Sequence, residues 1–243
     1  MSQPSIGQLY GVIDQSWPAL RRFDLGPFTL RQGANGGSRV SAATTLGPVT
    51  STDIDAAETA MRDMEQPRLF MIREWDTALD ADLNDRGYRI KDPVNVYVAP
   101  VEQIALKRPP QITTFEVWPP LVSQIEVWQA GGIGAGRLAV MQRANQPKTT
   151  LMGRVHDRPA GAVFVGTYDN IAMVHAMETA AQFRRNGLAR HMVTSCAFWA
   201  KQQCQSHLSM VCTQANDAAN GLYTSMGFAC VGQYHYRIHP EDT

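Results

Sequence analysis

The sequence lacks the features that most directly indicate a nucleic-acid or membrane partner. It has no basic run: 22 lysines and arginines balance 22 aspartates and glutamates, and the pI is near 7.0. No stretch approaches 18 consecutive apolar residues, the length that predicts a membrane-spanning helix. These absences argue against nucleic-acid binding and against a membrane span. We therefore expect the partner to be a small molecule or a peptide.

Cysteine motifs for metals and redox chemistry are also missing. The four cysteines, at positions 196, 204, 212 and 230, form no C-x-x-C pair, so we expect no zinc site and no thioredoxin-like centre. Their place on periodic apolar segments predicts reduced, buried thiols. The first residues show neither the basic nor the apolar region of a signal peptide, and we expect a cytoplasmic protein.

Five prolines interrupt the chain between residues 99 and 120. Because proline fixes φ and removes a backbone donor, this stretch predicts a connector. We place a domain boundary there, which divides the chain into residues 1–110 and 111–243. A chain of 243 residues is long enough for two small domains.

The second part predicts an α/β (α+β) fold with a mixed sheet. Three apolar runs separated by turn residues predict an antiparallel meander over 150–156, 161–168 and 171–179. The remaining periodicity predicts helices over 121–129, 137–143 and 185–203, a strand over 208–212, a helix from Asn216 to Gly227, and a strand over 228–236.

The first part repeats some of this pattern when the chain is shifted by 140 positions. Both parts then show a strand, a capped helix, a glycine, an aromatic residue and a second strand, which suggests two copies of one fold. A chance register is the alternative explanation, because identities are few. The shift sets residues 69–72 over 209–212, Asp76 over Asn216, Gly87 over Gly227, and Gly47 over Gly187 without a gap.

The segment from Gln182 to Ala189 follows a predicted strand and opens a helix. Backbone N–H groups converge at such a position, the helix dipole favours an anion, and arginine suits phosphate. An ordinary turn with solvated arginines is the alternative. The glycines of residues 131–136 fit no nucleotide-binding pattern and predict a flexible connection between helices. His235 and His239 lack further ligands, so we expect no metal.

A second segment, Asn216 to Phe228, contains Asn, small residues, Leu-Tyr and Gly-Phe. Together with Arg184–Ala189, which fits the pattern Arg/Gln-x-x-Gly-x-Gly/Ala, it resembles the GNAT superfamily of N-acetyltransferases. The resemblance covers residues 115–238. It extends weakly to the first part, which is similar to the degenerate amino-terminal copy of two-domain (tandem) members. It implies a duplicated, GNAT-like mixed and mostly antiparallel sheet flanked by helices.

The resemblance also implies acetyl-CoA as the co-substrate and a role for each matching residue. Tyr223 would be the general acid, since a phenol is protonated at neutral pH; a core tyrosine is the alternative. Asn216 would contact the pantetheine arm and cap its helix. The strand end from Met177 to Thr179 would pair with that arm. The pyrophosphate would be held by Arg184 and by the backbone amides of Arg185, Asn186, Gly187, Leu188 and Ala189.

Under the 140-residue shift, Leu83 stands where Tyr223 does and Thr44 where Arg184 does. We therefore expect only the second part to bind acetyl-CoA. Strand alternation puts His175 and Met177 on one face and Glu178 on the other. The acceptor of the amine proton is left open among His175, Glu178, Glu126 and a water chain.

We expect acetyl transfer to a primary amine of a small-molecule or peptide acceptor by direct attack in a ternary complex. The alternative function is a non-catalytic coenzyme A-binding sensor or regulatory module. Trp118, Trp128 and Tyr234 are candidates for an acceptor pocket, with core packing as the alternative for each. The sequence does not identify the acceptor, and it leaves a homodimer through a sheet edge open.

Overall fold

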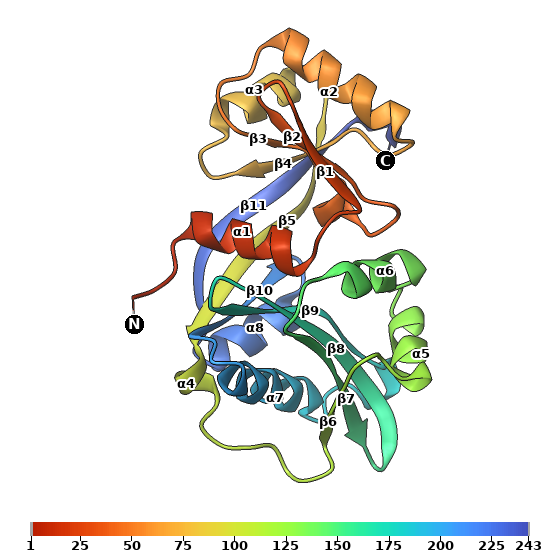
Figure 1. Cartoon of the computed structure of the whole chain (residues 1–243), viewed down its shortest axis with the longest axis vertical. Coiled ribbons are helices and arrows are strands. Elements are labelled where there is room, and N and C mark those ends of the chain that lie inside the picture. The colour runs from red at the N-terminus through yellow and green to blue at the C-terminus, as the bar shows by residue number, and fades with distance from the viewer. Residues whose placement is uncertain (1, 243) are drawn as a thin grey trace.

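The computed structural model describes residues 2–242 and contains one eight-stranded sheet and one three-stranded sheet (Figure 1). The helices are α1 (Ile6–Ser16), α2 (Ser51–Asp63), α3 (Thr77–Asp85), α4 (Val101–Ile104), α5 (Val122–Ala130), α6 (Ala135–Arg143), α7 (Leu188–Gln202) and α8 (Asp217–Ser225). The strands are β1 (Arg21–Leu25), β2 (Phe28–Gln32), β3 (Thr44–Thr45), β4 (Leu69–Arg73), β5 (Arg89–Pro100), β6 (Thr114–Val117), β7 (Lys148–Val155), β8 (Arg158–Tyr168), β9 (Ile171–Thr179), β10 (His207–Thr213) and β11 (Ala229–Ile238).

The large sheet has the strand order β4-β11-β5-β10-β9-β8-β7-β6. Its pairs are antiparallel except β9 with β10, which run parallel. Helices cover both faces: α7 and α8 pack on one side, and α1, α5 and α6 on the other. The predicted α+β fold with a mixed, mostly antiparallel sheet flanked by helices is therefore confirmed. The small sheet β1-β2-β3 packs with α2 and α3 around a separate core.

The predicted meander forms from β7, β8 and β9, and β9 has the bounds that the sequence predicts. Its two tight turns have positive φ angles at both central residues, 47° and 61° at His156 and Asp157, and 50° and 58° at Asp169 and Asn170. That geometry matches the right-handed twist of the flanking strands. Helix α7 begins at Leu188 rather than at residue 185, because Gly187 has a φ of 74°, in the left-handed region.

Strands from the two parts of the chain alternate in the sheet. Strand β5 lies between β10 and β11, and β11 lies between β5 and β4. Ser209 pairs with Val98, and Leu69 pairs with Ile238. Ser209 lies 140 positions after Leu69, and Ile238 lies 140 positions after Val98, so the two pairs are related by the shift. The register of the sheet therefore follows the repeat that the sequence suggests. The last strand of each part, β5 or β11, thus pairs with strands of the other part.

The ungapped alignment of Gly47 with Gly187 is wrong. Five residues, 46–50, connect β3 to α2, whereas eight, 180–187, connect β9 to α7. The loop that precedes α2 is therefore three residues shorter and has no counterpart of Gly187.

Three further expectations need correction. The predicted connector contains a strand, β6, at the edge of the sheet. Two of the four cysteines, Cys204 and Cys230, are exposed rather than buried. The connection between α5 and α6 is shorter than predicted, residues 131–134 instead of 131–136, because α6 begins at Ala135. Gly136 lies inside α6, where a Cβ would come 2.2 Å from the carbonyl oxygen of Asn35. Between residues 2 and 242, no helix has the length and apolar character needed to cross a bilayer.

Candidate functional site

The parallel strands β9 and β10 separate halfway along their length. Their register runs from Ile171 opposite His207 to Val174 opposite Met210 and then stops. Past that point β9 continues to Thr179, paired only with β8, and β10 continues to Thr213, paired only with β5. The backbone of β9 after Val174 therefore faces an opening in the sheet instead of a neighbouring strand.

A β-bulge shapes this end of β9. Ala162 pairs with Glu178 and Phe164 with His175, so two residues of β9 oppose one of β8. Ala176 has a φ of 49°, and its carbonyl oxygen accepts a 2.7 Å hydrogen bond from the indole of Trp128. Bulges bend a strand and redirect its side chains, and they are frequent beside active sites. The simple alternation predicted for residues 175–178 is therefore wrong.

Unpaired backbone amides gather at the N-terminus of α7. Among the described residues, the N–H groups of residues 185–190 donate no hydrogen bond. Gly187 is the N-cap residue and offers no side chain, and the first turn of α7 has no acidic residue. Free amides at the start of a 15-residue helix carry a partial positive charge and bind anions.

The side chains of this loop hold its shape. Asn186 donates from Nδ2 to the carbonyl oxygens of Phe183 and Arg184, and Leu188 is buried in the core below α7. Arg185, with a φ of 67°, is exposed, and Ala189 is half-buried. The loop therefore presents its backbone outward while its buried residues anchor it.

Arg184 points back along β9 and not over the free amides. Its Nε donates to the carbonyl oxygen of Thr179 at 3.0 Å, and an Nη lies 3.1 Å from a carboxylate oxygen of Glu178. The guanidinium is well exposed, so this pair is weak and easily exchanged. Met177 is half-buried against the core that α7 covers.

Tyr223 projects from α8 into the core beside the opening. Its ring makes edge contacts with Tyr97 and Phe228. Burial raises the pKa of its hydroxyl, helped by the nearby thiols of Cys212 and Cys196. That hydroxyl has no hydrogen-bond partner within residues 2–242. It is a protonated donor available to a ligand.

Asn216 caps α8, as predicted: its side chain accepts a 3.1 Å hydrogen bond from the amide of Ala219. Asn220, which the sequence motif did not include, holds the same loop. Its Nδ2 donates to three backbone carbonyls, and its Oδ1 accepts 2.8 Å and 3.0 Å hydrogen bonds from Tyr97 and Asn95 on β5. A polar residue four positions after a helix cap is a signal that could have identified it.

His175 is not available as a proton acceptor. It is buried, its Nδ1 accepts from Arg39 at 2.8 Å, and its Nε2 lies 2.8 Å from Ser16 Oγ. Burial and the charge of Arg39 hold the pKa of the imidazole well below its usual range. Because arginine only donates, the imidazole carries its proton on Nε2 and donates to Ser16. Of the other predicted acceptors, Glu178 is paired with Arg184 and Glu126 is exposed.

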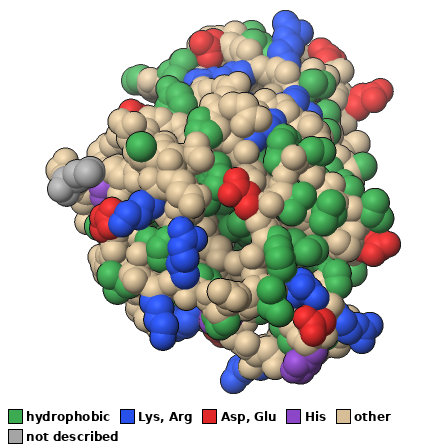
Figure 2. Space-filling view, turned by 60° about the horizontal axis from the view of Figure 1, so that its bottom comes forward, with side chains coloured by type: hydrophobic (Ala, Val, Ile, Leu, Met, Phe, Trp, Pro, Cys, Tyr) green, Lys and Arg blue, Asp and Glu red, His purple; other side chains and the backbone are tan. Residues whose placement is uncertain are grey.

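Around Glu178 lies a cavity of about 390 Å³ between the end of α5 and residues 180–184. A Cβ on Gly131 would come within 2.6 Å of the Glu178 side chain, so any larger residue there would require Glu178 to move. Figure 2, which turns the lower part of Figure 1 toward the viewer, shows a hollow near its centre. Hydrophobic side chains and an acidic one surround the hollow, and basic side chains lie farther out.

The corresponding place in the first part of the chain is a cavity of about 480 Å³ whose charged groups are arranged differently. Thr50 and Asp53 form a capping box at the start of α2, which puts a carboxylate where α7 has free amides. Arg73 at the end of β4 pairs with the buried Asp76 and donates to the carbonyl oxygen of Thr45 on β3. Its guanidinium therefore bridges the two strands at the point where β9 and β10 separate in the second part.

Comparison with known proteins agrees with this geometry. Residues 115–228 match the model of the acetyltransferase (GNAT) family. No curated protein sequence matches the chain. Similar solved structures include a GCN5-related N-acetyltransferase from Kribbella flavida (TM-score 0.70, 14% identity, covering 98% of this chain and 97% of that one). A functionally unknown protein from Staphylococcus epidermidis has a TM-score of 0.67 at 14% identity, covering 89% of this chain and 92% of that one.

A tandem GNAT protein from the clavulanic acid biosynthesis pathway is also similar, with a TM-score of 0.58 at 11% identity, covering 82% of this chain and 74% of that one. At these identities the structural matches show the fold alone. The sequence match spans β6 to α8 and includes the strand separation, the free amides and Tyr223. Residues 115–228 therefore match the GNAT acetyltransferase family model in sequence, and the chain shares its fold with these solved structures.

Proposed function

We propose that residues 111–243 transfer an acetyl group from acetyl-CoA to a primary amine by direct attack in a ternary complex. The observation that carries this proposal is the set of unpaired amides at residues 185–190, beside the separation of β9 from β10. A pyrophosphate on these amides directs the pantetheine arm along β9 toward Tyr223. Arg184 exchanges its exposed ion pair with Glu178 for a phosphate oxygen.

The reaction forms an N–C bond and breaks the C–S bond of the thioester. Tyr223 supplies the proton for the departing thiolate, because its hydroxyl is protonated and has no other partner. The proton of the amine leaves to water, since His175 already uses both ring nitrogens. A coenzyme A-binding sensor without turnover would not require a free phenol at this position.

We further propose that the chain contains two copies of one fold, residues 1–110 and 111–243, and that the first copy has no coenzyme site. The symmetrical register of the sheet supports the duplication. The likeness to a tandem GNAT protein agrees with it. The carboxylate of Asp53 at the start of α2 disfavours a phosphate in the first copy, and the guanidinium of Arg73 is already paired with Asp76.

Calorimetry and turnover test these proposals together. We expect one equivalent of acetyl-CoA per chain, and release of free thiol with a primary amine. Tyr223→Phe should lower kcat about 100-fold or more and leave acetyl-CoA affinity within about twofold, because general-acid catalysis contributes roughly 10²–10⁴-fold. Tyr97→Phe, which removes a neighbouring hydroxyl bonded to Asn220, is the control. Unchanged turnover in Tyr223→Phe, or two equivalents bound, would contradict the proposal.

A further inference from the structure

A second cavity, of about 180 Å³, opens on the other side of the strand separation. The end of β10 lines it through Val211, Cys212 and Thr213, which are the residues past the last pair with β9. Arg39 also lines the cavity and is hydrogen-bonded to His175. His175 is the first residue of β9 past its last pair with β10. Cys212 and Tyr223 also belong to the same buried core cluster. We call this cavity the Arg39 pocket.

Two guanidinium groups in the Arg39 pocket have no acidic partner. Neither Arg39 nor Arg137 forms an ion pair within the described part of the chain. Arg39 is fixed by the bond to His175 and by stacking 5.2 Å over the ring of Trp17. Surrounding protein, and then the charge of Arg39, lower the pKa of Arg137. Two like charges held near each other are relieved by an anion between them.

The same pocket contains a buried polar atom without a partner. The Tyr236 side chain is 2% exposed, and its hydroxyl lies near that of Tyr234 on the same strand but makes no hydrogen bond of good geometry. A buried hydroxyl destabilises the fold when it is left unpaired. A ligand oxygen that bonds to it removes that cost. This is a second and independent indication that the pocket takes a polar ligand.

The other charged lining residue is Asp92, on a bulge of β5 with a φ of 45°. One carboxylate and two guanidinium groups give the pocket a net charge of +1, which favours a ligand with a single negative charge. The volume is below the roughly 300–1,000 Å³ of pockets for drug-sized ligands. It therefore suits a molecule about the size of an amino acid.

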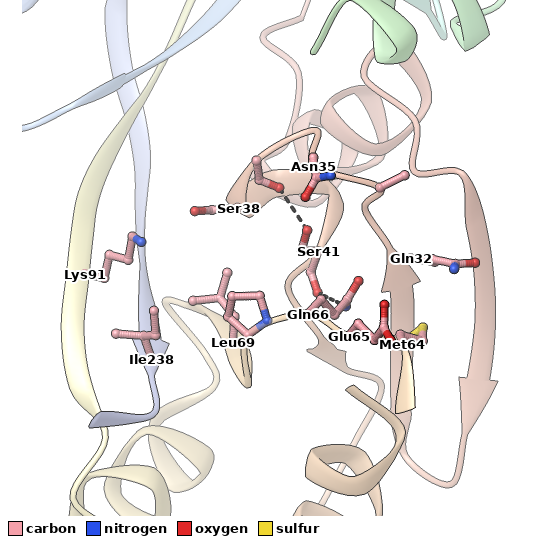
Figure 3. Close-up of a pocket in the computed structure, with 13 residues that line it drawn as sticks. Gln32, Asn35, Ser38, Ser41, Met64, Glu65, Gln66, Leu69, Lys91 and Ile238 are labelled. Atoms are coloured by element: carbon pink, nitrogen blue, oxygen red, sulfur yellow. Dashed lines mark hydrogen bonds between the residues drawn. The ribbon is translucent and has the colours of Figure 1, made fainter. Parts of the chain in front are cut away.

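The pocket on the opposite side of the loop over residues 34–41 lacks this arrangement. It has a volume of about 480 Å³. Figure 3 shows Lys91 and Ile238 on one side of it and polar residues such as Ser41 and Gln66 on the other. Its lysine is balanced by Glu65 among the lining residues. Ser41 and Gln66 are bonded to their own neighbours, Ser41 to the carbonyl oxygen of Gly37 and Gln66 to that of Ser41. An unpaired cation pair occurs in the Arg39 pocket and not here.

We propose that the Arg39 pocket binds the carboxylate of the acceptor, and that the acceptor is an amino-acid-sized primary amine carrying one carboxylate. This inference rests on the proposed acetyl transfer, because it assigns the second substrate of the same site. The carboxylate lies between Arg39 and Arg137 and bonds to the Tyr236 hydroxyl. The amine then points past Cys212 toward the opening and Tyr223.

Matched pairs of amines test the inference. β-Alanine against β-alaninamide, and 4-aminobutyrate against butylamine, differ in the carboxylate and keep the primary amine. Thiol release is measured with each, and calorimetry with coenzyme A present measures their binding without turnover. We expect the acids to be preferred about 10- to 100-fold, the range of charge-assisted hydrogen bonds. Equal use and equal binding of the acid and the uncharged partner would overturn the inference.

Arg137→Gln should raise KM for the acids about tenfold, change kcat little and abolish the preference for acids. Its side chain is accessible on α6, so the substitution leaves the core intact. Arg108→Gln removes the same charge from an exposed arginine that stacks on Phe198 at a distant cavity, and should change nothing. Thiol release that is equal for acids and amides refutes the pocket assignment alone. Acid binding without thiol release from any amine refutes the acetyl transfer alone.

Discussion

The free amides of α7 can be tested by giving this helix the cap that α2 already has. In α2 the third residue is Asp53, whose carboxylate bonds back to Thr50 and stands over the first amides. The third residue of α7 is Arg190, which donates to Ser225 Oγ at 2.7 Å. Arg190→Asp puts a carboxylate at the corresponding position, in front of the amides proposed to hold the pyrophosphate.

The expected loss of affinity follows from Coulomb repulsion between that carboxylate and one phosphate charge. At a separation of about 5 Å, the repulsion is about 1 kcal/mol with the dielectric constant of water and about 3 kcal/mol at an effective value near 20. These energies correspond to an increase of about 5- to 150-fold in the Kd for coenzyme A. The same carboxylate stabilises the helix, because an acid in the first turn contributes about 0.3–1 kcal/mol.

Binding and stability should therefore move in opposite directions, which a merely disruptive substitution does not do. Calorimetry with coenzyme A and urea unfolding without ligand measure the two effects. The matched control is Arg190→Asn, which also loses the positive charge and the bond to Ser225 but adds no carboxylate. Arg190→Asp should bind more weakly than Arg190→Asn and unfold at higher urea. Equal affinities in these two variants would refute the assignment of the amides.

Other parts of the molecule give independent predictions. Arg73→Met leaves the buried carboxylate of Asp76 without its partner and should lower the free energy of unfolding, measured with urea, by about 3 kcal/mol. Adding Asp76→Asn should recover part of that loss. Full stability of the single variant would show that the pair is dispensable. Titration of the native protein with a thiol reagent at pH 8 should label two thiols per chain quickly, Cys204 and Cys230. Burial raises the pKa of Cys212 to about 11, so rapid labelling of a third thiol below that pH would contradict the described packing.

Local patterns predicted the parts of the fold that neighbouring residues decide. Strand β9 has the predicted bounds because turn residues limit it at its start and its apolar run sets its length. The cap at Asn216 is likewise decided within one helical turn. By contrast, nothing local indicates that β5 lies between β10 and β11, since its partners are more than 100 residues away. The edge strand β6 escaped notice because prolines surround it.

The candidate site shows the same division. The loop from Arg184 to Ala189 is one continuous segment, so its pattern could be found from the sequence. The bulge at Ala176 depends on the indole of Trp128, which lies 48 positions earlier, and this contact reverses the inference that strand alternation gives for His175 and Glu178. A predicted proton acceptor thus becomes a residue that positions Arg39.

The Arg39 pocket could not be predicted, because it combines segments from both parts of the chain. Arg39 follows β2, Asp92 lies on β5, Arg137 lies on α6, and Tyr236 lies on β11. They meet because β5 and β11 each lie beside strands of the other part of the chain. In addition, Gly136 lets α6 approach the loop at Asn35. The first part of the chain has the capping box of α2 at the place of the free amides of α7, yet it supplies one of the two arginines. The proposed acceptor binding would therefore explain its retention in the molecule, together with the shared sheet.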